Sequence, residues 1–131
     1  MTKAELVIIG GGPAGLCAAI SAAKSGANVL LIDKSKNLGG QLIKQTHMFF
    51  GSEKQYASVR GIDIPKILIN ELHKYKENVK IKTETTVVGM FEDGIITLLE
   101  KEDNYYKIAP KAVSVATGAY EKALSFPNND L

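Results

Sequence analysis

A glycine-rich turn near the start of the chain has the residue types and the spacing of a phosphate-binding site. Gly10, Gly12 and Gly15 form the pattern G-x-G-x-x-G within the segment ELVIIGGGPAGLCAAISAAKSGANVLLIDKS. The first glycine permits a tight turn, the second lets the backbone approach a pyrophosphate, and the third permits close packing of helix on strand. A helix that begins here presents unpaired N–H groups and the positive end of its dipole to the phosphates.

An acidic residue completes this pattern. Asp33 ends the second apolar run, 18 residues after Gly15, and a carboxylate there accepts hydrogen bonds from ribose hydroxyls. The same charge repels a 2′-phosphate, so the sequence disfavours NADP at this site. The alternative is a glycine-rich turn without a ligand and a surface aspartate. We disfavour it because strand, turn, helix, strand and acid occur in register.

The flanking segments predict the strand–helix–strand unit that positions these residues. Residues 6–9 are apolar and β-branched, which is typical of a strand buried on both faces of a parallel sheet. Residues 13–25 have apolar side chains at helical spacing, and Pro13 suits the first helical turn. Residues 28–32 predict a second buried strand. Together these segments form a βαβ unit of about 30 residues.

The rest of the chain predicts more strands than helices. Residues 34–50 are expected to be a long loop with short helical pieces, and residues 62–76 a helix with one apolar face. The turn sequences EDG and EDN separate three short strand candidates. In all, further strands are expected at residues 79–82, 86–92, 95–101, 105–108 and 111–116. The expected fold class is α/β and Rossmann-like: a parallel sheet with one helical layer and, on the other face, a small β-meander.

Composition and charge exclude several classes of protein. The chain has 131 residues, of which 45% are hydrophobic and 23% charged, with a formal net charge of +2. The charges are interspersed, so we expect no nucleic-acid partner and no membrane partner. No apolar run approaches the roughly 20 residues that span a bilayer, and the first residues do not resemble a signal peptide. We therefore expect one cytoplasmic domain.

Several reactive or apolar residues have ordinary structural interpretations. Cys17 is the only cysteine, which excludes a dithiol mechanism within the chain, and we interpret it as a small buried residue. His47 is interpreted as a loop histidine beside Met48, Phe49 and Phe50, because no partner carboxylate can be named. These three apolar residues are expected to fill the core. No residue is identified as a catalytic acid, base or nucleophile, and no metal site is predicted.

The glycine pattern alone does not distinguish FAD from NAD. The segment KNLGGQL places a second glycine pair beyond Asp33, where it permits another close approach to an extended ligand. The segment SVATGAY predicts a buried strand that ends at Thr117 and Gly118. The alternative for each is an ordinary turn. Between them lie three short strands, where a simple NAD domain would have a crossover helix.

Together these residues resemble the FAD-binding domain of the pyridine nucleotide–disulfide oxidoreductase superfamily, in which GGGPAG, the acid, GGQL and ATG occur in this order with a β-meander before ATG. More narrowly, LGGQLIKQTHMFFGSEKQYASVRGIDI and ATGAYEKALSFPNNDL look like FAD-dependent oxidoreductases related to the alpha subunits of sarcosine oxidase, opine oxidase and hydrogen cyanide synthase. The resemblance covers essentially the whole chain.

The resemblance implies FAD contacts for residues in four parts of the chain. The pyrophosphate would be held by Gly10, Gly12, Pro13, Ala14 and Gly15. The adenosine side would be bound by Asp33, Lys34 and the backbone of Val87. The flavin side would be approached by Gly40 and Gln41, and the cofactor covered by Thr117 and Gly118. The family more often has glutamate at the acidic position, so Asp33 has a shorter reach.

The resemblance also implies an activity. The flavin would carry hydride or electrons, and the full-length enzyme would use NAD(P)H as a partner substrate or oxidise an amine-type substrate. Family members insert an NAD(P)-binding domain after ATG and then return with a GD-type segment that contacts the flavin. We therefore expect residues 1–131 to be an FAD-binding domain, the N-terminal fragment of a longer enzyme, and to be inactive alone. A homodimer or other subunits of an oxidoreductase complex are the expected protein partners.

Two alternatives remain open. The first is an NAD-binding dehydrogenase domain that uses only the first glycine pattern, and it predicts a helix in place of the meander at residues 86–108. The second is a truncated, non-catalytic fragment that does not hold a cofactor alone. It predicts exposed apolar side chains at residues 48–50 and on the sheet edge.

Overall fold

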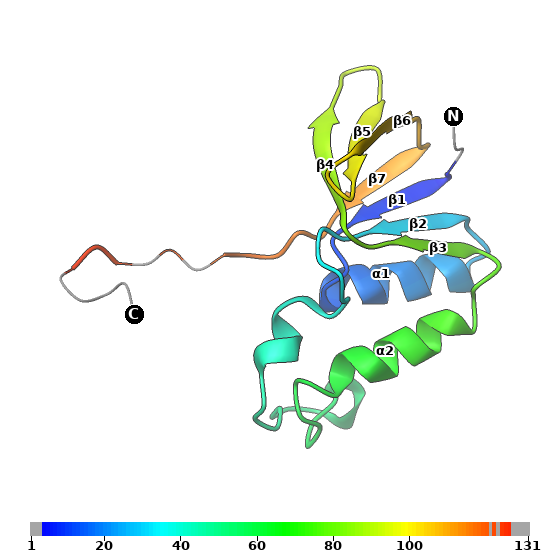
Figure 1. Cartoon of the computed structure of the whole chain (residues 1–131). Helices are drawn as coiled ribbons and strands as arrows, with labels where there is room; N and C mark the ends of the chain where they lie inside the picture. Colours follow the sequence, from blue (N-terminus) through cyan, green and yellow to red (C-terminus); the bar gives the residue numbers. More distant parts are fainter. Residues whose placement is uncertain (1–3, 121, 123, 127–131) are drawn as a thin grey trace.

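The computed structural model describes residues 4–120, 122 and 124–126, and within them the chain forms two β-sheets and two α-helices (Figure 1). A four-stranded sheet has the order β3-β2-β1-β7, and a three-stranded sheet has the order β4-β5-β6. The strands are β1 (Leu6–Ile9), β2 (Val29–Ile32), β3 (Val79–Lys82), β4 (Thr85–Met90), β5 (Ile96–Glu100), β6 (Asn104–Ile108) and β7 (Ala112–Val115). The α-helices are α1 (Pro13–Lys24) and α2 (Ile64–His73), and the 3₁₀-helices are η1 (Gly40–Lys44) and η2 (Glu53–Gln55).

The predicted βαβ unit is confirmed, with β1 at the centre of the parallel sheet. Ile8 of β1 lies opposite Leu31 of β2 and opposite Ser114 of β7, and both pairings are parallel. The chain adds β2 and β3 on one side of β1 and later adds β7 on the other side. In open α/β sheets, ligands bind outside the carboxyl ends of the strands at the point where the strand order reverses in this way.

Two hydrophobic cores lie on opposite faces of the parallel sheet. Helices α1 and α2 cover one face, where the buried side chains include Ile8, Leu16, Leu31, Leu68 and Leu72. The meander of β4, β5 and β6 covers the other face, where the buried side chains include Val7, Leu30, Ile32, Leu98 and Ile108. The side chains of β1 and β2 thus alternate between the cores, because successive residues of a strand point to opposite faces. The expected helical layer and meander are both confirmed.

Helix α2 is shorter than the predicted helix over residues 62–76. It begins at Ile64, with Asp63 in the N-cap position and a proline in the first turn. Beyond His73 the chain continues in turns, in which the amide of Tyr75 donates to the carbonyl of Leu72 at 2.9 Å. Ile67, which the pattern places on the apolar face, is 41% exposed. The apolar period therefore overestimated both the length and the width of the buried face.

A partly exposed ion pair joins the two sheets. Lys82 at the end of β3 donates to both carboxylate oxygens of Glu100 in β5, at 3.0 Å each, and its Nζ lies 5.0 Å from the centre of the Tyr106 ring. The hydrogen bond from Lys82 lowers the pKa of Glu100 below its ordinary value. A lowered carboxyl pKa gives stability that is present above the ordinary pKa and is lost as the pH falls through the folded-state pKa.

We expect Lys82→Met to lower the free energy of unfolding at pH 7 by less than about 1 kcal/mol, because both side chains are partly solvated. The substitution should also reduce the loss of stability between pH 7 and pH 3, since the pKa of Glu100 then returns toward its ordinary value. Urea unfolding followed by circular dichroism at both pH values measures this. Lys80→Met, on the same strand at an exposed position, is the control. The same pH dependence in wild type and Lys82→Met would contradict the prediction.

Candidate functional site

The predicted site residues converge on the carboxyl-terminal edge of the parallel sheet. The glycine turn follows β1, Asp33 and Lys34 follow β2, and Thr117 and Gly118 follow β7. Gly40 and Gln41 begin η1, which lies beyond β2 along the chain. Figure 1 shows this edge on the side where the chain leaves β7. Val87 is set apart on β4, where its side chain packs against the core under the meander.

Two of the three motif glycines are required by the fold itself. Gly10 has φ +109°, and a Cβ atom there would overlap the backbone of Ala116 at the end of β7. The same Cβ atom would lie 3.1 Å from the amide nitrogen of Thr117. A Cβ atom on Gly15 would overlap the carbonyl group of Gly10. These two glycines therefore let the turn, α1 and β7 pack at close range, which agrees with the roles predicted for a tight turn and for helix–strand packing.

Gly12 is different, because nothing in the fold requires a glycine there. Its φ of −75° is ordinary for any residue. A Cβ atom on Gly12 would find its nearest neighbour, the Cα of Gly40, at 3.8 Å, which is normal van der Waals contact. The space beside Gly12 is thus open in the protein, and a side chain would enter it. A glycine at such a position fits the close approach of a ligand to the backbone.

The N-terminus of α1 offers amide groups to this space. Gly12 is the N-cap and provides no side-chain cap, and the first hydrogen bond of the helix runs from the amide of Leu16 to the carbonyl of Gly12 at 2.9 Å. The amides of Ala14 and Gly15 have no hydrogen bond to any residue in the described chain. Pro13 and Ala14 are exposed. Free amides and the positive dipole end of a 12-residue helix favour an anion here.

Asp33 is tied to the glycine turn by a bond that the sequence did not reveal. Its Oδ2 accepts a hydrogen bond from the amide of Gly11 at 2.6 Å, and its Oδ1 accepts one from the amide of Ser35 at 2.7 Å. A Cβ atom on Gly11 would overlap Leu38 and lie 3.0 Å from Asp33 Oδ2. The signal for this contact was Gly11, the middle glycine of the run GGG, which lies outside the G-x-G-x-x-G pattern. A carboxylate accepts about four hydrogen bonds, so Asp33 retains capacity for ribose hydroxyls.

The second glycine pair lies directly against the first turn. The amide of Gly39 donates to the carbonyl of Gly11 at 2.8 Å. Gly40 has φ +54°, and a Cβ atom there would lie 3.0 Å from the Cα of Gly12. We expected this glycine pair to approach a ligand closely. At least part of its close approach is instead to the first glycine turn of the protein. Gly40 and Gln41 are both exposed, and Gly40 borders the open space beside Gly12.

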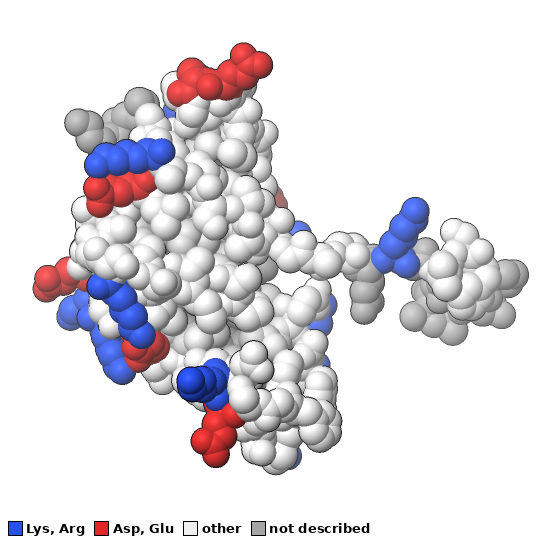
Figure 2. Space-filling view, turned by 180° about the vertical axis from the view of Figure 1, so that it is seen from behind, with Lys and Arg blue, Asp and Glu red and all other residues white. Residues whose placement is uncertain are grey.

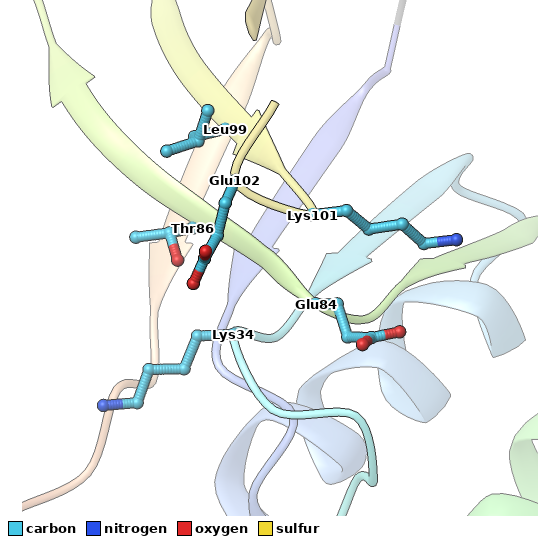
Figure 3. A pocket seen from close by; sticks show the side chains of 6 residues that line it. All are labelled: Lys34, Glu84, Thr86, Leu99, Lys101 and Glu102. Atoms are coloured by element: carbon cyan, nitrogen blue, oxygen red, sulfur yellow. The ribbon is translucent and has the colours of Figure 1, made fainter. Parts of the chain in front are cut away.

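An open pocket of about 350 Å³ lies where Lys34 meets the meander (Figure 3). It is lined by Lys34, Glu84, Thr86, Leu99, Lys101 and Glu102. In Figure 3, the side chains of Glu84 and Lys101 extend to one side, away from Lys34. Next to two of the lining residues in the chain, the amide of Thr85 donates a hydrogen bond to the carbonyl of Asp33 at 3.0 Å.

The last two predicted residues, Thr117 and Gly118, follow β7 and are both exposed. Gly118 has φ +72°, and a Cβ atom there would meet no other atom within 4 Å. The described residues thus leave this side of the site open. Residues 127–131, the end of the segment ATGAYEKALSFPNNDL that contributed to the family resemblance, lie outside the described residues.

The structure corrects two interpretations of single residues. Cys17 was expected to be buried but is exposed, because the buried face of α1 is formed by other residues: Gly15, Leu16, Ala19, Ile20 and Ala23. Met48 and Phe50 were expected in the core but are 53% and 95% exposed, and only Phe49 packs against it. His47 stacks on the Phe49 ring at 5.3 Å, which agrees with the interpretation of a loop histidine.

Among residues 4–120, 122 and 124–126, no group of three His, Cys, Asp or Glu side chains is arranged to hold a metal ion. No helix in the same part of the chain is both long enough and apolar enough to cross a membrane.

The comparisons with known proteins agree with this arrangement. The model of the family "Pyridine nucleotide-disulphide oxidoreductase" matches residues 4–131. Sarcosine oxidase subunit alpha of Rhizobium meliloti is 29% identical over 140 residues, which cover 96% of this chain and 13% of that protein. Hydrogen cyanide synthase subunit HcnB of Pseudomonas protegens is 27% identical over 121 residues, which cover 92% of this chain and 26% of that protein.

Solved structures show the same relationship. L-proline dehydrogenase from P. horikoshii superposes with a TM-score of 0.84 at 30% identity, covering 99% of this chain and 25% of that one. The putative thioredoxin reductase TrxB from Bacillus anthracis superposes with a TM-score of 0.70 at 27% identity, covering 95% of this chain and 40% of that one. The chain thus spans between 13% and 40% of the length of these four proteins.

Proposed function

The chain belongs to the pyridine nucleotide-disulphide oxidoreductase family, and from this we propose that it is the FAD-binding part of a flavin-dependent oxidoreductase. The observation that carries the proposal is the open space at Gly12, a glycine that the fold does not need but that a pyrophosphate would. The free amides of α1 follow Gly12 in the chain, and the carboxylate of Asp33 accepts a hydrogen bond from the amide of the neighbouring Gly11. The residues present therefore fit a dinucleotide with an anionic centre and a ribose.

Each part of FAD has residues proposed to hold it. The pyrophosphate would bind at Gly12 and at the amides that follow Pro13, namely those of Ala14 and Gly15, in a turn shaped by Gly10. The ribose of adenosine would bind Asp33, and the adenine would lie near Lys34 and the backbone of Val87. The flavin side would pass Gly40 and Gln41, and it would be covered by Thr117 and Gly118. Support comes from the placement of all but Val87 along one edge of the sheet.

The role proposed for this chain is to bind and orient the cofactor. Bound FAD supplies hydride or electron transfer, for which NAD(P)H would be a partner substrate of the whole enzyme. The chain's own contribution is to anchor the pyrophosphate and adenosine, so that the flavin is presented at the open edge of the sheet. Because that edge is exposed at Gln41, Thr117 and Gly118, we propose that residues 1–131 act with further protein, as one domain of a longer enzyme or beside another subunit, and are inactive alone.

A second candidate is favoured by one specific observation. A fragment that holds no cofactor alone was expected to expose apolar side chains at residues 48–50 and on the sheet edge. Met48 and Phe50 are exposed, and Val115 at the end of β7 is 63% exposed. The NAD-binding alternative, by contrast, predicted a helix at residues 86–108. The structure has an antiparallel meander there instead. The helix that would have distinguished the NAD-binding alternative is therefore absent from these residues.

A ligand titration separates the proposed function from the second candidate. We expect FAD and ADP to bind the purified chain in competition, because both contain the adenosine and the pyrophosphate that this chain is proposed to hold. FMN, which lacks both of these groups, should bind more weakly than FAD. Flavin fluorescence and calorimetry measure the affinities, and circular dichroism confirms that the chain is folded. A folded chain that binds neither FAD nor ADP would favour the non-binding fragment.

A further inference from the structure

Gly11 is buried and is held from both sides by the loop that follows β2. Its amide donates to Oδ2 of Asp33 at 2.6 Å, and its carbonyl accepts a hydrogen bond from the amide of Gly39 at 2.8 Å. A Cβ atom on Gly11 would overlap the side chain of Leu38. Residues 33–39 therefore fix both of the peptide groups that meet at Gly11, although this glycine lies outside the G-x-G-x-x-G pattern.

The bond between Gly39 and Gly11 also sets the direction of the amide of Gly12. The peptide group between Gly11 and Gly12 is trans, and in a planar trans peptide the N–H group points opposite to the C=O group. Because the carbonyl of Gly11 points to Gly39, the amide of Gly12 points away from Gly39. This amide has no hydrogen bond to any residue in the described chain. The loop after β2 thus sets in advance the direction of an unpaired amide beside the space proposed for the pyrophosphate.

The carboxylate of Asp33 suits this task because each of its oxygens accepts a hydrogen bond from a backbone amide. Oδ1 accepts from the amide of Ser35 at 2.7 Å, which fixes the side chain locally. Oδ2 is then aimed at the amide of Gly11, 22 residues earlier in the chain. Hydrogen bonds to an ionised acceptor are stronger than those between neutral groups. An asparagine in place of Asp33 has one acceptor oxygen, so its NH₂ group would face one of the two amides.

We propose that Asp33 is a positioning residue for the glycine turn, which acts through Gly11 to hold the turn in the shape that binds a pyrophosphate. This role rests on the proposed function and goes beyond the ribose contact proposed there. A turn that is already ordered binds a ligand more tightly, because the ligand does not have to order it. Loss of the bond between Asp33 and Gly11 therefore weakens the binding of a pyrophosphate ligand even when that ligand has no ribose hydroxyls.

Two nucleotides separate the positioning role from the ribose contact. ADP carries the ribose hydroxyls, and 2′,3′-dideoxy-ADP lacks both of them. In calorimetric titrations, we expect Asp33→Asn to bind dideoxy-ADP about tenfold more weakly than wild type does, and to lose at least as much affinity for ADP. If Asp33 acts on the ribose alone, a folded Asp33→Asn protein binds dideoxy-ADP as tightly as wild type does. That result would overturn the proposal.

A second variant breaks the same bond from the other side. Gly11→Ala places a methyl group 3.0 Å from Oδ2 of Asp33 and against Leu38, but it leaves the carboxylate in the chain. It should also weaken the binding of dideoxy-ADP by about tenfold. The double variant should lose little more affinity than either single variant, because both changes remove one bond. Losses that add in full would show that the two residues act separately, and would overturn the proposal.

Asp93→Asn is the matched control for the loss of a carboxylate. Oδ1 of Asp93 accepts a hydrogen bond from the amide of Ile95 at 3.1 Å, which is the same local bond that Asp33 makes to Ser35. Asp93 lies in the turn between β4 and β5. Figure 2 shows acidic side chains at the top of the molecule, where Figure 1 places this turn, away from the carboxyl-terminal edge of the parallel sheet.

The control variant should bind both nucleotides as wild type does, and circular dichroism checks that every variant is folded. Equally weak binding by Asp93→Asn and Asp33→Asn would trace the loss to the change in net charge and would overturn the positioning role. A folded wild type that binds neither nucleotide is a different result. It would overturn the proposed function itself, and the positioning role with it.

Discussion

Replacing Gly15 with alanine is expected to lower the free energy of unfolding by about 3 kcal/mol or more. The added Cβ atom would overlap the carbonyl group of Gly10, a backbone group that has no freedom to rotate away. Helix α1 would have to move off β1, and the buried contacts of Leu16 with the sheet would loosen. Overpacking of a close contact typically costs about 1–3 kcal/mol, and a rigid backbone partner places this case at the upper end or beyond.

The higher helix propensity of alanine acts in the opposite direction to this loss of stability. In a helix interior alanine is more favourable than glycine by about 1 kcal/mol, so a net loss of stability shows that the close contact dominates. Urea unfolding followed by circular dichroism measures the difference. Gly12→Ala is the matched control, because it makes the same chemical change three residues earlier with no atom closer than 3.8 Å. A stability of Gly15→Ala equal to that of wild type would contradict the close packing of α1 on the turn.

The strands of the sheet could be predicted well because each is a short run of suitable length and is bounded by turn residues. Residues 6–9 and 79–82 were predicted with the bounds that β1 and β3 have in the structure. Both are short runs bounded by turn residues, and a run of this length is compatible with a strand but too short for a typical helix. The meander was predictable because EDG and EDN interrupt the apolar segments at hairpin spacing. Its placement on the face opposite the helices was also predicted, and there it shares a hydrophobic core with the parallel sheet that contains Val7, Leu30 and Leu98.

Helix faces and loops were less predictable because composition does not select a face. In α1, alanines and Cys17 surround the helix, so small apolar residues occur on both the buried and the exposed side. Only the packing against β1 and β2 decides which side is buried. Likewise Met48, Phe49 and Phe50 are equally apolar, but the loop turns only Phe49 toward the core. A prediction from hydrophobicity alone therefore buried Cys17, Met48 and Phe50, which are exposed.

The positions of the glycine turn and of Asp33 in the strand–turn–helix–strand unit could be predicted from the sequence, but the contacts between them could not. The G-x-G-x-x-G spacing identified which glycines matter, since each has a distinct steric role in a strand–turn–helix unit. It did not predict that Asp33 accepts a hydrogen bond from Gly11 or that Gly40 packs against Gly12. Both contacts join residues far apart in the chain, and both depend on how the loop after β2 folds back. They also mean that Asp33 has a structural role in addition to the proposed ligand role.

Replacing Gly12 with alanine is expected to separate folding from ligand binding. The φ of −75° suits alanine, and the nearest atom to the new Cβ is 3.8 Å away. Alanine is a poorer N-cap than glycine, but it also loses less conformational entropy on folding, so stability should change by less than about 1 kcal/mol. The new methyl group instead occupies the space proposed for the pyrophosphate. We expect ADP and FAD to bind more weakly by about 2 kcal/mol, which is roughly 30-fold.

Calorimetric titration with ADP measures this effect without relying on the flavin or on activity. Lys80→Met, which lies on β3 outside the proposed site, should bind ADP as wild type does. Because Gly12→Ala is also the stable control for Gly15→Ala, the two substitutions divide the motif into a glycine that the fold requires and one that the ligand requires. Equal ADP affinity in wild type and a folded Gly12→Ala protein would contradict this division. The open space at Gly12 would then have no role in binding, and the proposed function would lose the observation that carries it.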